Sequence, residues 1–331
     1  MSVLIIEAKN LSREFTVYSK ENGSFFMLNQ ILGRKGTKKK VVDNINMDIA
    51  EGEMVGYLGP NGAGKSTTIK MLSGVLTPTS GELKVLGREP GKYRKENAKD
   101  IGVLYGQRTQ LWWDLKLKDS FELLKAIYKV DSKVYKKRLD NFIEILDMEE
   151  FINRPVRQLS LGQRMRGEMV ATLLHSPPIL FLDEPTIGLD VLAKNKIQEF
   201  LKFLNKEEKT TVLITSHNMD DIEKLCDRIV LIDQGKIMFD GAKNNLKKMT
   251  TKKDTLIVEI ALEDMNKIPS LIPLKKEDNK MYFEFSDHEE VPKIINELSK
   301  QFRLIKIEIE TPEIEQVLRE LYENKQYGMV L

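Results

Sequence analysis

The sequence predicts an α/β fold with a parallel core sheet, an inserted helical subdomain and a small α+β domain after it. Apolar, strand-like segments alternate with loops and helix-like segments over most of the chain, as in parallel sheets with crossover helices. Helical periodicity dominates the middle, about 110–170. After "NNLKKMTTKKDT" the composition changes to strands of period two. We therefore expect one domain over 1–245 and a second over 246–331.

The first elements are strands that lead into a glycine-rich loop. "VLIIEAKNL" (3–11) and "VVDNINMDIA" (41–50) alternate or run apolar, and "GEMVGYLG" (52–59) is a short apolar run. A helix, "TTIKMLSGVL", follows, and the turn cluster "TPTSGE" closes it.

The helical subdomain is predicted from two periodic segments. "DSFELLKAIYKV" (119–130) pairs Asp119 as N-cap with Glu122 three residues later, which predicts a helix start at this point. Its apolar residues share one face: Phe121, Leu124 and Tyr128. "VYKKRLDNFIEILDM" (134–148) has the same pattern.

Strands return after the helical subdomain. The core segments are "PPILFLDE" (177–184), "TTVLITSH" (210–217) and "DRIVLIDQGKIMF" (227–239), with helices between them. In the C-terminal domain we expect half-buried strands at 256–262, 281–286 and 303–310, and helices at 291–302 and 312–325.

Composition excludes several classes of protein. The 52 basic and 50 acidic residues nearly balance, so net charge does not favour a nucleic-acid partner. The single cysteine, Cys226, excludes an internal disulfide and a cysteine-rich metal site, and we expect it to be buried. We see no signal peptide and no apolar run near the ~20 residues of a spanning helix, so we expect a cytosolic protein.

The glycine-rich loop has the pattern of a P-loop. "GPNGAGKST" fits G-x-x-x-x-G-K-[ST] between an apolar strand and a helix, the context in which this loop binds phosphates. Lys65 can reach the β- and γ-phosphates, and the Ser66 hydroxyl can ligate Mg²⁺. The predicted ATP-binding residues are Gly59, Pro60, Asn61, Gly62, Ala63, Gly64, Lys65, Ser66 and Thr67.

Further polar residues follow strands downstream. In "ILFLDEPT", Asp183 suits Mg²⁺ and Glu184 can deprotonate an attacking water; alone, such a pair is more often a solvated loop, but after a P-loop the odds reverse. His217 ends the strand "TTVLITSH" and could hold a γ-phosphate or the catalytic water, although a lone histidine is more often structural. Gln107 taken alone is an ordinary loop glutamine.

In this order the motifs resemble the ATPase subunit of ABC transporters over roughly residues 3–245. The resemblance implies a P-loop ABC-type ATPase core, with "GPNGAGKST" as Walker A and "ILFLDE" as Walker B. It also implies Gln107 as the Q-loop residue and a Mg²⁺ ligand with Ser66 and Asp183, Asp190 as the D-loop residue, and His217 as the switch histidine. The signature "LSLGQ" supplies Ser160, Leu161, Gly162 and Gln163, and departs from the family pattern at Leu161.

The resemblance also implies a mechanism and partners. Two such ATPases pack head to tail, and the signature of one covers the γ-phosphate of ATP on the P-loop of the other. Ser160 and the helix N-terminus after it supply donors and positive potential for that anion. We expect ATP and Mg²⁺ as cofactors, a second copy and polytopic membrane permease subunits as partners, and a peripheral location on the cytoplasmic side of the cell membrane. The C-terminal domain resembles the accessory domain of the efflux branch, which favours export.

Three segments leave alternatives open. Phe15 is expected to stack on adenine, with Tyr18 or plain core packing as alternatives. The segment 18–40 is apolar and then basic, so it is either a solvated loop with a small core or an amphipathic helix near lipid headgroups or the membrane partner. Trp112 and Trp113 either line a groove for the membrane partner or belong to the core.

Two other functions compete with a transporter subunit. A soluble ABC ATPase that acts on ribosomes or DNA usually has two cassettes, long coiled coils or zinc clusters, which this sequence lacks. A P-loop kinase or GTPase explains Lys65 and Ser66 but leaves "LSLGQ" without a role. No nucleic acid is expected, and the sequence does not identify the cargo.

Overall fold

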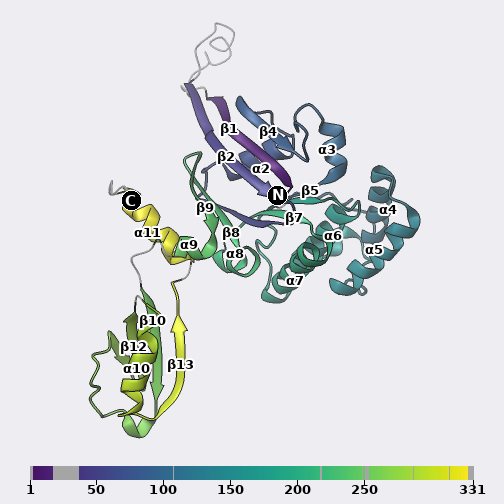
Figure 1. Cartoon of the computed structure of the whole chain (residues 1–331). Coiled ribbons are helices and arrows are strands. Elements are labelled where there is room, and N and C mark those ends of the chain that lie inside the picture. The colour runs from purple at the N-terminus through teal and green to yellow at the C-terminus, as the bar shows by residue number, and fades with distance from the viewer. Residues whose placement is uncertain are drawn as a thin grey trace, which may run out of the picture. The chain divides into compact units, whose positions relative to one another are not determined.

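The computed structural model describes residues 3–17, 37–106, 108–216, 218–247, 249, 253–285, 287–312 and 314–326. The chain forms two compact units, Met1–Ala242 and Lys243–Leu331 (Figure 1). Tyr18, Gln107, His217 and most of the 18–40 segment lie outside the described residues. Within the described ranges, no helix has the length and apolar character needed to cross a membrane.

The first unit is built on a six-stranded sheet in the order β5-β6-β7-β3-β8-β9. Its strands are β3 (Met54–Leu58), β5 (Ile101–Tyr105), β6 (Ile179–Asp183), β7 (Thr211–Thr215), β8 (Arg228–Asp233) and β9 (Lys236–Ala242). The first five strands in this order are parallel, which confirms the predicted sheet, and β3 and β7 are buried along their whole length. Short apolar runs form such strands because both faces of the sheet are covered.

The segment 227–239 folds differently from the single strand-like piece expected there. It forms a hairpin in which β9 runs antiparallel to β8. Gln234 and Gly235 both have positive φ, 48° and 81°, which is the geometry of a tight two-residue turn whose twist matches the strands. The turn signal in the sequence is the polar stretch Asp-Gln-Gly-Lys between two apolar runs.

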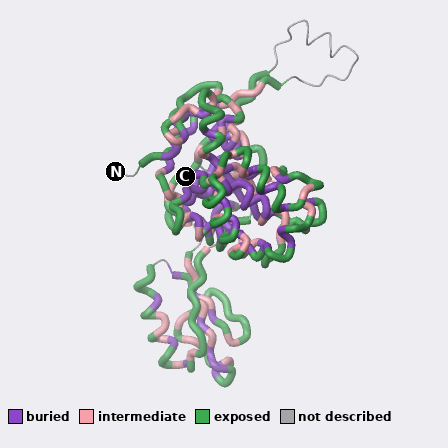
Figure 2. Tube along the Cα trace, turned by 90° about the vertical axis from the view of Figure 1, so that its right-hand side faces the viewer, coloured by how far each residue is buried: buried purple, intermediate pink, exposed green. Residues whose placement is uncertain are grey.

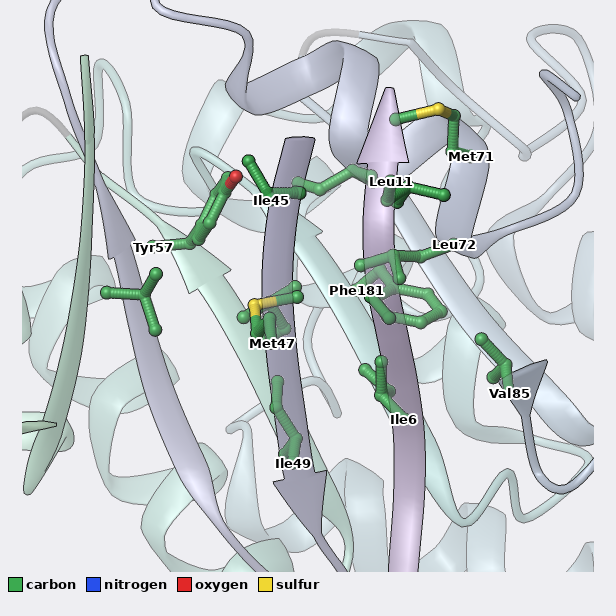
Figure 3. Close-up of a cluster of buried hydrophobic side chains, with 14 of the residues drawn as sticks. Ile6, Leu11, Ile45, Met47, Ile49, Tyr57, Met71, Leu72, Val85 and Phe181 are labelled. Carbon is green, nitrogen blue, oxygen red and sulfur yellow. The ribbon is translucent and has the colours of Figure 1, made fainter. Parts of the chain in front are cut away.

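A second sheet of three antiparallel strands lies against the first, in the order β2-β1-β4. Its strands are β1 (Leu4–Val17), β2 (Thr37–Ala50) and β4 (Ser80–Val85). One cluster of buried side chains joins the two sheets to helix α2 (Lys65–Leu72). Figure 3 shows its members from β1, β2, β3, α2, β4 and β6: Ile6, Leu11, Ile45, Met47, Ile49, Tyr57, Met71, Leu72, Val85 and Phe181. This packing fixes where β3 ends and α2 begins.

Strands β4 and β5 and the short helix α3 (Arg94–Asp100) were not predicted from the sequence.

Helices α4 (Leu117–Tyr128), α5 (Ser132–Ile145) and α6 (Leu161–Leu173) form the helical part, with a 3-10 turn at Val156–Gln158. The prediction that Asp119 caps the first of them is wrong: the N-cap is Lys116, and Asp119 lies in the first turn. The helix begins early because two of its first backbone N–H groups donate to distant carbonyls, Leu117 N to Arg154 O and Lys118 N to Ile152 O. Helices α7 (Val191–Glu208) and α8 (Met219–Leu225) complete the unit.

The second unit contains a four-stranded antiparallel sheet in the order β11-β12-β10-β13. Its elements are α9 (Lys243–Lys247), β10 (Asp254–Ile260), a 3-10 turn at Leu262–Asp264, β11 (Lys275–Glu277), β12 (Lys280–Phe285), α10 (Glu290–Ser299), β13 (Leu304–Glu310) and α11 (Ile314–Gln326). Its core gathers side chains of β10, β12 and α10. Figure 2 shows long exposed stretches in this unit, in contrast to the densely buried sheet of the first.

Candidate functional site

The glycine-rich loop between β3 and α2 has no room for a side chain at two positions. A Cβ on Gly59 would lie 2.1 Å from the carbonyl oxygen of Ile232. Gly64 has φ +113°, and a Cβ there would lie 2.7 Å from the carbonyl oxygen of Val41. The loop therefore lies close against its neighbours, and the absence of side chains leaves its N–H groups available to an anion at the start of α2.

Lys65 is buried at the first position of α2. Its Nζ donates to the carbonyl oxygens of Gly59 at 2.6 Å and Pro60 at 3.1 Å. Burial lowers the pKa of Lys65, and the nearby charges of Glu184 and Asp183 partly oppose that change. The ammonium group is thus held against the loop and close to the acidic pair.

Ser66 and Asp183 come from different elements and meet directly. The Ser66 Oγ donates to Oδ2 of Asp183 at 2.9 Å, and the Thr215 Oγ1 donates to Oδ1 of the same carboxylate at 2.7 Å. Asp183 ends β6 and Thr215 ends β7, which lies next to it in the sheet. Both carboxylate oxygens are therefore oriented toward the P-loop side of the sheet edge, where open α/β sheets bind ligands.

Glu184 has a left-handed backbone, with φ 56°. Its N–H donates to the carbonyl oxygen of Thr215 at 3.1 Å and lies 3.2 Å from the Thr215 Oγ1. A non-glycine residue with positive φ is uncommon and often marks a functional site. Glu184 also lines a cavity of about 380 Å³ together with Gly188, Lys194 and Ser216. The charges of Glu184 and Asp183 both act on the Lys65 ammonium, so Glu184 lies close to the P-loop lysine as well as to this cavity.

In the sequence, Gln107 and His217 come shortly after β5 and β7, two parallel strands whose carboxyl ends lie at the same edge of the sheet. Gly106 donates its N–H to the carbonyl oxygen of Asp183 at 2.8 Å, and Ser216 follows β7 directly. Gln107 and His217 themselves lie outside the described residues. Phe15 lies half-buried on β1, and the Arg13 guanidinium carbon is 4.8 Å from the centre of its ring.

The signature residues form the first turn of α6. Ser160 is the N-cap: its hydroxyl accepts from Gln163 N at 3.2 Å, and the Gln163 Oε1 accepts from Ser160 N at 3.0 Å. This reciprocal capping fixes the helix start. Gly162 packs against α7, because a Cβ there would lie 2.9 Å from the Cβ of Ala193. Leu161 is exposed at the first helical position.

Asp190 is likewise an N-cap. Its Oδ1 accepts from Ala193 N at 2.8 Å and so starts α7. Trp112 and Trp113, farther along the helical part, are both partly exposed, so the alternative that they belong to the core is wrong. Cys226 is fully buried, as predicted.

Sequence reasoning missed Asp221, a fully buried carboxylate beside the cavity. It accepts from Thr186 Oγ1 at 2.6 Å and from Gln198 Nε2 at 2.5 Å, and Lys194 Nζ lies 2.8 Å away. The Ser216 Oγ is 3.4 Å from the same carboxylate. Asp221 therefore joins the segment after Glu184, helix α7 and the loop that carries His217. The sequence "MDDIEKL" holds no signal that separates it from the exposed Asp220.

Glu168 is a second buried carboxylate that the sequence did not reveal. It accepts hydrogen bonds from the Thr109 hydroxyl and, at 3.0 Å, from Gln110 N. The Gln110 side chain in turn donates to the Thr172 Oγ1 at 2.9 Å. Burial raises the pKa of Glu168. These contacts hold the segment after Gln107 against the helix that begins at the signature.

Comparisons with known proteins agree with this geometry. Residues 42–187 match the family model described as ABC transporter. The chain is 34% identical to the ABC transporter ATP-binding protein NatA of Bacillus subtilis (strain 168), over 66% of this chain and 89% of that protein. It is 31% identical to the bacitracin transport ATP-binding protein BcrA of Bacillus licheniformis, over 82% of this chain and 85% of that protein.

Solved structures give the same result. A dimeric ATP-binding cassette in a post-hydrolysis state, bound to ADP and Pi, superposes with a TM-score of 0.59 at 26% identity, over 72% of this chain and 98% of that one. The resemblance predicted from the order of motifs is thus confirmed, as is the α/β P-loop core. The chain belongs to the ABC transporter family, as an ATP-binding subunit that hydrolyses ATP.

Proposed function

We propose that this ATPase energises export through separate polytopic membrane permease subunits. ATP would hold two copies head to tail, and hydrolysis would release them, so that the cycle drives the permease between two states. Relatives with export or resistance in their names support the direction of transport: the linearmycin resistance ATP-binding protein LnrL of Bacillus subtilis (strain 168) and the Nod factor export ATP-binding protein I of Ralstonia nicotianae (strain ATCC BAA-1114 / GMI1000). The subunit would lie peripherally on the cytoplasmic side of the cell membrane.

The hydrogen bond between Ser66 and Asp183, beside the buried ammonium of Lys65, carries the proposal for the site. The hydroxyl and carboxylate oxygens are ligands that Mg²⁺ prefers, so the residues fit this ion, with Gln107 as a further proposed ligand. Bound Mg²⁺ neutralises charge on the phosphates. Lys65 would exchange its bonds to the carbonyls of Gly59 and Pro60 for bonds to the β- and γ-phosphate oxygens.

Glu184 would act as the general base toward the attacking water. Thr215 contacts both residues of the pair: it accepts from the Glu184 backbone N–H, and its hydroxyl donates to Asp183. In this proposal Asp183, which accepts from the Ser66 hydroxyl, serves the Mg²⁺ site, and Glu184 serves in proton transfer. His217 is proposed as the switch residue that holds the γ-phosphate, and Phe15 as the ring that stacks on adenine. Arg13 lies over one face of that ring, so the base would stack on the opposite face.

The first turn of α6 would act across the dimer. The capping pair Ser160 and Gln163 presents a defined helix N-terminus, whose N–H groups and dipole attract a γ-phosphate of the second copy. Gly162 lets α6 approach α7, and Asp190 caps α7 nearby. Because one chain contains the residues proposed for both halves of the shared site, we propose a homodimer.

The experiment that tests this function captures the ATP-bound complex. A tagged Glu184→Gln variant is extracted gently from membranes with ATP, and the proteins that accompany it are identified. We expect polytopic membrane proteins. The matched control, Glu184→Gln with Lys65→Ala, lacks the proposed phosphate contact and should lose the ATP-stabilised dimer. Recovery of ribosomes or DNA with no membrane protein would refute the transporter role.

A further inference from the structure

Strand β13 forms an edge of the sheet in the second unit. The strand order is β11-β12-β10-β13, and β13 pairs with β10 from Leu304 to Glu310, with one register irregularity that leaves Ile305 without a partner on β10. Among the described residues, no strand pairs with its outer side. An edge of this length presents backbone N–H and C=O groups that another strand can pair with, which proteins usually block with a charge, a bulge or a covering element. Here the irregularity lies near one end of the strand, and Lys306 to Glu310 stay in regular register.

The face of β13 that belongs to the core is incompletely covered. Ile307 lies opposite Val258 and Ile309 opposite Leu256, and both of these β10 residues are fully buried under α10. Directly opposite residues share a face of the sheet. Yet Ile307 and Ile309 are 42% and 46% exposed, and Ile305, at the register irregularity, is 57% exposed. Helix α10 therefore covers β10 and β12 and leaves an apolar strip along β13.

The opposite face of β13 is charged. Lys306 and Glu308 alternate with the isoleucines, and the Lys306 Nζ lies 2.5 Å from Oε1 of Glu308. Both side chains are exposed. The strand thus reads Ile-Lys-Ile-Glu-Ile, with apolar residues on one face and one charge of each sign on the other.

We propose that β13 pairs antiparallel with β13 of a second copy, around a two-fold axis at Ile307. In this register Ile307 meets the partner's Ile307, and Ile305 meets the partner's Ile309. Lys306 meets the partner's Glu308, and the symmetry makes this contact twice. An axis at Lys306 would oppose two lysines, and an axis at Glu308 would oppose two glutamates. Charge complementarity therefore selects the register centred on Ile307.

The pairing would cover both the edge of β13 and its apolar strip. The four-stranded sheets of the two copies would join into one continuous sheet with β13 at its centre, so neither copy would keep that edge. The two isoleucine strips would lie side by side between the two α10 helices. This contact is separate from the ATP-dependent contact of the cassettes, because it involves no nucleotide and no residue of Met1–Ala242.

The test measures dimerisation of the full-length chain without nucleotide, by sedimentation velocity over a concentration series. Lys306→Glu and Glu308→Lys should each make the dimer roughly 10- to 100-fold weaker, since each turns two attractive cross-strand pairs into repulsive ones. An equimolar mixture of these two variants should form a heterodimer about as tight as the wild type, because each meets its opposite charge. The double variant in one chain should also dimerise.

Two further variants separate the apolar strip from general surface charge. Ile307→Lys should weaken the dimer at least about tenfold, whereas Ile272→Lys, at a position of the same unit that is 93% exposed, should leave it unchanged. A wild-type chain that stays monomeric at about 50 μM without nucleotide would overturn the proposal. Failure of the mixed charge variants to pair would overturn it too. The ATP-held dimer of Glu184→Gln should survive every one of these substitutions, so a failure here leaves the proposed function intact.

Discussion

Replacing Asp221 by alanine tests whether a buried carboxylate holds the catalytic loops together. Asp221 is fully buried and bonded to Thr186, Gln198 and Lys194, which lie on two different segments. Removing it leaves the donors of three residues without their acceptor. The neighbouring Asp220 is exposed in the same first turn of α8 and offers a matched control.

The cost follows from which donors can reach water. Lys194 keeps 17% of its side chain exposed, so its ammonium can turn outward. Thr186 and Gln198 are buried and cannot, and each orphaned buried donor costs about 1–3 kcal/mol. Breaking a buried ion pair from one side costs about 3–5 kcal/mol in other proteins, which agrees with that sum. We expect Asp221→Ala to lower the free energy of unfolding by about 3–5 kcal/mol and Asp220→Ala by less than about 0.5 kcal/mol.

Urea denaturation followed by tryptophan fluorescence measures this difference. Both tryptophans, Trp112 and Trp113, lie in Met1–Ala242, so the signal reports the unit that contains Asp221. We also expect a larger drop in kcat than in ATP affinity, because Asp221 positions Ser216 and the loop after it rather than the phosphates. Asp221→Asn keeps the shape and should retain part of the stability. A loss below about 1 kcal/mol in Asp221→Ala, or equal losses in both alanine variants, would refute the reasoning.

Three further predictions concern the shared site, the P-loop and a buried histidine. Ser160→Asp keeps a good N-cap for α6 but sets a negative charge toward the γ-phosphate of the second copy, so kcat should fall at least about tenfold while ATP binding to the monomer stays; wild-type turnover would contradict the shared site. Gly59→Ala puts a Cβ 2.1 Å from the carbonyl oxygen of Ile232, whereas Gly62→Ala puts it in open space and adds only the strain of a φ of +82°, so Gly59→Ala should reduce ATP affinity more. A fluorescent ATP analogue measures both, and the reverse order would contradict the geometry. Burial lowers the pKa of His175 in the folded state. As pH falls, the unfolded chain therefore binds a proton on His175 at a higher pH than the folded chain does. The free energy of unfolding should then fall as pH drops below about 6.5, by at most about 1.4 kcal/mol per pH unit. The His175→Phe variant should lack this loss of stability when its urea midpoints at pH 7.5 and 5.5 are compared. An equal change of midpoint in the wild type and the variant would show that His175 does not cause the loss.

The residues that could be predicted from sequence are those placed by local pattern. Short apolar runs identify β3 and β6, and the carboxyl ends of parallel strands meet at one edge of a sheet. That rule alone brings Ser66 near Asp183, and the structure shows them hydrogen-bonded. Reciprocal capping by Ser160 and Gln163 is also a local contact, three residues apart.

The residues that could not be predicted depend on contacts far apart in the chain. Glu168 is buried because Thr109 and Gln110, nearly sixty residues earlier, supply its donors. The start of α4 is set by Arg154 and Ile152, which outcompete the local signal at Asp119. In each case the deciding partner has no fixed spacing, so no periodicity in the sequence reports it.

The turn of the β8–β9 hairpin supports the P-loop from outside. Gly235 donates its N–H to the carbonyl oxygen of Ala63 at 3.0 Å and accepts from Asp43 N at 2.8 Å. Its positive φ and the nearby Val41 carbonyl, 2.8 Å from a Cβ placed there, leave no room for a side chain. A genetic screen for lost ATP binding would therefore recover substitutions at Gly235, which lies 172 residues after Ala63 in the chain. Affinity for nucleotide in this protein is thus adjustable at a position that lies outside the nucleotide-binding loop.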